Sequence, residues 1–134
     1  MPMSVAALAP ERPALVLEPS KRAPGLARRY LSVRYAEMGC SDDYIGQVVV
    51  TELVTNSYKH VGFGRIVVRV LPEADEGLVL IEVSDDGSGL PVVREAGGDA
   101  LCGRGLLLVV QLVMDWGVRP LDGGGKVVWA RCAR

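Results

Sequence analysis

Two short runs of β-branched and aliphatic residues constrain the fold of this chain more than any other feature. The runs are RIVVRVL at residues 65–71 and LVLIEVS at residues 78–84, and the polar segment PEADEG separates them. Val and Ile suit the half-buried surface of a sheet, and a short polar connection between two such runs is typical of an antiparallel strand pair. We therefore expect two adjacent strands in the middle of a sheet.

Two helices are expected before this strand pair. Residues 20–38 repeat apolar side chains at helical intervals and carry arginines elsewhere, and the expected buried positions are Leu26, Tyr30, Val33 and Ala36. Ser41, followed by two aspartates, is the expected N-cap of a second helix, which should end near residue 61, before Gly62 and Gly64.

Further strands flank these elements. We expect an edge strand at residues 14–17, an apolar helix at 106–114, and strands at 116–120 and 126–131 joined by a turn at 122–125. This order predicts an α/β (α+β) fold, a two-layer sandwich of helices on a mixed, mostly antiparallel sheet. Residues 1–13, rich in proline, are expected to be a flexible N-terminal tail before a single domain at 14–134.

Composition and charge exclude several classes of protein. The chain has 134 residues, of which 49% are apolar, which argues against a disordered protein. A net charge of -1 provides no general field for nucleic acid or an anionic membrane. Residues 106–114, the longest apolar stretch, reach roughly half the length of a membrane span. The three cysteines show no metal or disulfide pattern, so we expect reduced thiols in the cytoplasm.

The second helix carries unusual polarity at its C-terminal end. Glu52, Asn56, Lys59 and His60 fall on or beside the face defined by the apolar positions Ile45, Val48, Val49 and Leu53. Buried polar groups need partners, water or a ligand, so one interpretation is a lined cavity. The alternative is that the carboxylate and ammonium are solvated and that the amide and imidazole cap the helix end.

Two glycine-rich segments follow the strand pair. Asp85 comes directly after an apolar strand, and Gly87 and Gly89 allow a sharp turn that a flat ligand can approach. A carboxylate there can accept a hydrogen bond from an exocyclic amine such as that of adenine. Residues 103–105, Gly-Arg-Gly, precede an apolar helix whose free amides can meet phosphate oxygens. The alternatives are an ordinary acidic turn and a helix start that needs flexibility.

The order of these motifs resembles the GHKL superfamily of ATP-binding domains. The motifs are ELVTNSYKH, VSDDGSGLP and GRGLLLVV, and the similarity extends over roughly residues 14–132. The chain looks most like the short, stand-alone branch of anti-sigma factors and serine-protein kinases, which shares a late Asp-x-Gly-Gly-Gly-Lys turn, here at residues 122–126. The resemblance implies a Bergerat-type ATP-binding fold, with residues 14–134 as a histidine kinase-like ATP-binding domain.

The resemblance also assigns roles to residues of the second helix. It implies that Glu52 is the general base and that Asn56 holds Mg2+ against the phosphates of ATP. Lys59 or His60 would approach a phosphate, although either could be structural.

The two glycine segments receive roles in the same way. Asp85 would read adenine, Gly87 and Gly89 would shape its turn, and residues 90–102 would form the ATP lid. The residues on the phosphate side would be Gly103, Arg104 and Gly105.

The implied activity is transfer of the γ-phosphoryl group to a serine of an anti-sigma factor antagonist, with a sigma factor as the competing partner and a possible homodimer. Two other readings stay open. The domain could be a nucleotide-responsive binding module that transfers no phosphate, or a scaffold whose nucleotide pocket is degenerate.

Overall fold

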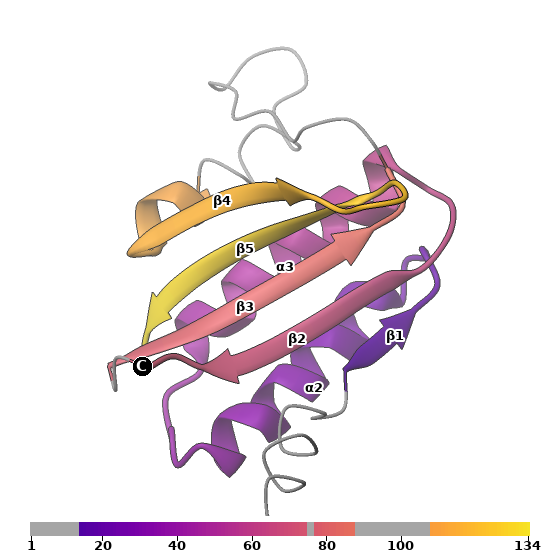
Figure 1. Cartoon of the computed structure of the whole chain (residues 1–134). Coiled ribbons are helices and arrows are strands. Elements are labelled where there is room, and N and C mark those ends of the chain that lie inside the picture. Colours follow the sequence, from indigo (N-terminus) through magenta and orange to yellow (C-terminus); the bar gives the residue numbers. More distant parts are fainter. Residues whose placement is uncertain (1–13, 75–76, 88–107) are drawn as a thin grey trace, which may run out of the picture.

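The structure, a computed structural model, describes residues 14–74, 77–87 and 108–134 (Figure 1). The tail expected at residues 1–13 lies outside these residues. The elements in chain order are β1 (Leu15–Leu17), α2 (Ala23–Glu37), α3 (Tyr44–His60), β2 (Ile66–Pro72), β3 (Leu78–Asp85), β4 (Asp115–Pro120) and β5 (Lys126–Ala133). Residues 108–112 add a short helical stretch before β4.

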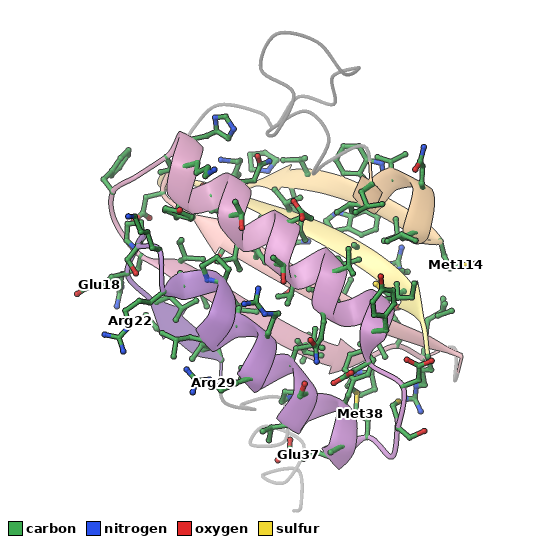
Figure 2. All side chains as sticks on the ribbon, turned by 180° about the vertical axis from the view of Figure 1, so that it is seen from behind. Glu18, Arg22, Arg29, Glu37, Met38 and Met114 are labelled. Carbon is green, nitrogen blue, oxygen red and sulfur yellow. The ribbon has the colours of Figure 1, made fainter. Side chains whose placement is uncertain are left out.

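The strands form one sheet, covered on one face by α2 and α3. The strand order is β1-β2-β3-β5-β4, and each of these pairings is antiparallel. Figures 1 and 2, which view the molecule from opposite sides, show both helices side by side on the same face of the sheet. The predicted two-layer α+β architecture is confirmed, and so is the central position of β2 and β3.

The core lies between this sheet face and the helices. Strict alternation along β3 turns Val79, Ile81 and Val83 inward, where each is fully buried. The same alternation brings Asp85, the last residue of the strand, to the inward face. A carboxylate therefore continues the line of core residues at the end of the sheet. Among the described residues, no helix has the length and hydropathy needed to cross a bilayer.

The buried face of α2 differs from the prediction. Its core positions are Ala23, Ala27, Leu31 and Tyr35. Of the expected positions, Tyr30 is half-buried and Ala36 is exposed, while Leu26 and Val33 are 36% and 58% exposed. The predicted face was therefore rotated toward solvent by one helical position.

The physical reason is that Arg34 is buried instead of marking the solvent face. Its Nε and Nη2 donate to the carbonyl oxygen of Val70 at 3.0 and 2.8 Å, and its Nη1 donates to Glu37 at 2.7 Å. Strand β1 pairs with β2 only as far as Val68, so the carbonyl of Val70 is available to a side chain. A satisfied guanidinium can be buried at a position where an unpaired one would be costly.

The start of α3 also differs from the prediction. The helix begins at Tyr44, so Ser41 lies outside it and is not the N-cap. Asp42 accepts a hydrogen bond from the amide of Tyr44 at 3.1 Å. Asp43 accepts one from the hydroxyl of Ser32 on α2 at 2.6 Å, which lowers the pKa of the Asp43 carboxyl. The two acids therefore fix the helix start and tie it to α2.

The helix expected at residues 106–114 ends earlier than predicted. The described helical residues are 108–112, and residues 106 and 107 lie outside the described part of the chain. The amide of Met114 donates to the carbonyl of Arg131 at 2.9 Å, which draws the chain into the sheet, and β4 begins at Asp115. Strand β5 continues to Ala133, two residues beyond its predicted end.

The two helices approach each other most closely where Tyr35 of α2 meets Gly46 of α3. A Cβ atom on Gly46 would lie 2.6 Å from Tyr35 Oη and 2.8 Å from its Cζ. The hydroxyl is buried and has no hydrogen-bond partner within the described residues. Burial also raises the pKa of Tyr35. Only glycine at position 46 leaves room for this ring.

We predict that Gly46→Ala destabilises the protein, although alanine is the better helix former by about 1 kcal/mol. Forcing an extra methyl group into a packed contact costs about 1–3 kcal/mol, which outweighs that gain. The matched control is Gly25→Ala in α2, where the nearest atom to the new methyl would be 3.6 Å away. Urea unfolding should show a loss for the first variant and no loss for the second. Equal behaviour of the two variants would contradict the contact.

Candidate functional site

Asp85 is the centre of the candidate site. Its side chain is 1% exposed. Oδ2 accepts a hydrogen bond from Ser57 Oγ at 2.6 Å, and Oδ1 accepts from Lys126 Nζ at 2.8 Å and from the amide of Gly87 at 3.0 Å. A buried carboxylate is tolerated when charge and hydrogen bonds compensate it, and these contacts provide both.

Three elements bring these groups together. Asp85 pairs directly with Lys126 in the β3–β5 register, so both side chains point to the same inward face. Ser57 belongs to the buried face of α3. The turn before β5 contains Gly125 with φ +90°, where a Cβ would lie 2.5 Å from the carbonyl oxygen of Asp85. A glycine is required there, because the turn passes against β3 as it delivers Lys126.

The turn after β3 is equally tight at Gly87. A Cβ atom there would lie 2.5 Å from Val61 Cγ2 and 3.2 Å from Lys126 Nζ. The sequence analysis expected Gly87 to shape this turn, and the structure places its backbone amide on Asp85. The next carboxylate, Asp86, is exposed and accepts a hydrogen bond from the amide of Arg65 at 3.1 Å. The two adjacent acids thus have opposite environments.

The polar residues of α3 lie beside its core face. The buried positions are Gly46, Val49, Val50, Leu53, Val54 and Ser57. Glu52 and Asn56 are half-buried on the flank of this face, whereas Lys59 and His60 are exposed. Glu52 precedes Ser57 by five residues, which corresponds to about 7.5 Å along the helix axis.

Glu52 has a perturbed acidity. Burial raises the pKa of its carboxyl above the ordinary value of 4.5, and the positive charge of Lys59 opposes part of that rise. A carboxyl that is less acidic than usual is a better proton acceptor near neutral pH. Among titratable side chains, such a shift is one indicator of a functional position.

Ser57 and Lys126 were not among the site residues predicted from the sequence. Ser57 occupies a helical position that continues the apolar positions Leu53 and Val54, so a polar residue there was a usable signal. Lys126 shares the inward register of Val128 and Ala130 on β5, which strand alternation alone could have indicated. Both signals concern polar residues at core positions.

Several predicted site residues lie outside the described part of the chain. They are Gly89, Gly103, Arg104 and Gly105, together with the expected lid at residues 90–102. Within residues 14–74, 77–87 and 108–134, no group of three or more His, Cys, Asp or Glu side chains could hold a metal ion. Asn56 would therefore hold a metal only together with oxygen atoms of a ligand.

A two-layer fold with a buried carboxylate beside a glycine turn is compatible with a nucleotide-binding domain. A comparison with protein-family models agrees: the model of the histidine kinase-like ATPase domain matches residues 17–132. The chain therefore belongs to the histidine kinase-like ATPase domain family, which implies binding of ATP. No curated protein matches the sequence.

The residues present fit the base of such a nucleotide. A carboxylate offers about four acceptor positions, and protein donors fill three of those on Asp85. As far as the described residues go, one position, on Oδ2, is left for an amine of the ligand. The lack of a side chain at Gly87 makes room for Val61 and for Lys126 Nζ, and so keeps the Gly87 amide within hydrogen-bond distance of Asp85.

We predict that Asp85→Asn destabilises the protein without any nucleotide by about 3–5 kcal/mol, because it leaves the buried Lys126 ammonium without a counter-charge. The control is Asp86→Asn, whose exposed side chain keeps an oxygen for the Arg65 amide and should change stability by no more than about 0.5 kcal/mol. Urea unfolding of both variants measures the difference. Similar losses would mean that the Asp85–Lys126 pair contributes nothing specific.

Proposed function

We propose that this protein is an ATP-binding regulator, an anti-sigma factor with protein-serine kinase activity. Its substrate would be a serine of an anti-sigma factor antagonist, and a sigma factor would be the competing partner, both acting in the cytoplasm. By controlling which partner is free, the protein would regulate transcription. The single observation that carries the nucleotide part of this proposal is the buried Asp85, with an acceptor position left beside a glycine turn.

The kinase part depends on Glu52. Its half-buried carboxyl, with a raised pKa, lies on the same flank of α3 as Asn56. As a general base, Glu52 would take the proton of the substrate serine while the serine oxygen bonds to the γ-phosphorus and the bond to ADP breaks. Mg2+, when bound through Asn56 and phosphate oxygens, would neutralise charge on the phosphates.

The exposed residues at the end of α3 complete the proposed site. Lys59 lies two helical turns after Glu52 and lowers the pKa of its carboxyl, so its charge reaches the flank where the phosphates would bind. His60 ends the same helix. Both side chains are accessible to a ligand, and we propose that Lys59 contacts a phosphate.

The test of the proposed activity is an incubation with Mg-ATP and a candidate antagonist protein. We expect phosphorylation of the antagonist to be lost in Glu52→Gln, while ATP still raises the melting temperature, because binding to the folded state stabilises it. Glu18→Gln, at an exposed position directly after β1 (Figure 2), is the control and should keep activity.

Three outcomes separate the readings. Phosphorylation that survives Glu52→Gln refutes the assignment of the base. ATP binding without any phosphorylation favours a nucleotide-responsive binding module. The absence of a shift in melting temperature with ATP or ADP favours a degenerate pocket.

The pH dependence of kinase activity provides a further prediction. Activity requires the deprotonated form of Glu52, so it should fall as the pH drops through a pKa that burial holds above 4.5. Lys59→Met removes the charge that lowers this pKa, so the acid limb should move to higher pH. This shift of the acid limb should become smaller at high salt, because Lys59 is exposed and its charge is screened. Lys21→Met, at an exposed position before α2, should leave the profile unchanged; an equal move in both variants would contradict the coupling.

A further inference from the structure

The Lys126 side chain occupies an unusual place for a lysine. It is 10% exposed, and its Nζ lies 2.8 Å from Asp85 Oδ1. It also lies 3.2 Å from the point where a Cβ would stand on Gly87. The ammonium is therefore packed against the turn at Gly87, beside the carboxylate of Asp85 and close to the Val61 side chain.

The hydrogen-bond capacity of this pair is incompletely used. An ammonium has three N–H donors, and among the described residues the acceptor of Lys126 is Asp85 Oδ1. Oδ1 also accepts from the amide of Gly87, which fills its two acceptor positions. Within the described part of the chain, Oδ2 accepts from Ser57 and keeps one acceptor position. The pair thus offers an acceptor on Asp85 beside donors on Lys126.

This arrangement matches one edge of adenine. The 6-amino group of adenine is a donor, and the adjacent ring nitrogen N1 is an acceptor. Resting on the ATP site proposed above, we propose that Lys126 is a base-reading residue, whose ammonium donates to adenine N1 while Asp85 accepts from the 6-amino group. The opposite charges of Asp85 and Lys126 also cancel, so a neutral base meets a polar but uncharged pair.

If Lys126 only neutralised the charge of Asp85, its loss would affect nucleotide binding in a different way from the loss of a base-reading lysine. In that case, its loss would weaken the site for every nucleotide to the same extent, whatever atom stands at position 1 of the base. A lysine that donates to N1 makes binding sensitive to that one atom. The distinguishing probe is 1-deaza-ATP, in which a C–H group replaces N1 and cannot accept a hydrogen bond.

The first arm of the test uses the unaltered protein. Calorimetric titration should show that 1-deaza-ATP binds about 10- to 100-fold more weakly than ATP, as expected for losing a hydrogen bond to a charged donor. This arm needs no variant, so it stands even if a change at Lys126 prevents folding.

The second arm uses Lys126→Met, which keeps the length of the side chain but has no donor. The ratio of the two affinities should fall close to one. Lys21→Met, which removes an exposed charge before α2, should keep the ratio of the unaltered protein.

The possible failures are distinguishable. Equal binding of ATP and 1-deaza-ATP by the unaltered protein overturns the reading of N1, while the ATP site stands. Tighter ATP binding by Lys126→Met also overturns it, because the lysine would then obstruct the base. If ATP does not bind at all, the proposed nucleotide site fails, and this inference fails with it.

Discussion

The buried ion pair between Asp85 and Lys126 is the interaction on which the arrangement of the site depends. It joins the end of β3 to the start of β5, and the hydroxyl of Ser57 ties α3 to the same carboxylate. Two charges removed from water are stable only when their geometry is good and their remaining hydrogen bonds are made. A shift of β5 by one residue would turn Lys126 to the other face of the sheet, and a rotation of α3 would withdraw Ser57. The same contacts therefore specify strand register, helix orientation and the shape of the site.

This constraint explains why the site is an extension of the core. The inward line of β3 runs through Val79, Ile81 and Val83 before it reaches Asp85, so the carboxylate is held by elements that the hydrophobic core already fixes. Sites supported by packed strands and helices keep their geometry better than sites on loops. The glycines at 87 and 125 serve the same end, because any side chain there would collide with Val61 or with the β3 backbone.

The sequence was informative where local pattern decides the outcome. The β-branched runs predicted β2 and β3. The polar residue after the second run drew attention to Asp85, which the structure buries at the end of β3, while its binding role stays a prediction. The predictions were wrong where a contact with a residue distant in the sequence determines the local structure. Arg34 was taken as a solvent marker on α2, but the free carbonyl of Val70, 36 residues away, allows its burial. Ser41 was taken as an N-cap, although the bond from Ser32 to Asp43 sets the start of α3. Strand alternation could have placed Lys126 at an inward position, but its ion pair with Asp85 depends on the register between β3 and β5.

The two acids of the site illustrate how environment separates roles. Asp85 is surrounded by donors from a hydroxyl, an ammonium and a backbone amide, and such groups favour its use as a fixed acceptor. Burial has the largest effect on the acidity of Glu52, and it raises the pKa of the carboxyl. Lys59 counteracts that rise only from the exposed end of the helix. A carboxyl whose charged form is disfavoured by burial gains from taking a proton. In the proposed function, base recognition and proton transfer would therefore occupy separate carboxylates, with α3 holding Glu52 and β3 holding Asp85.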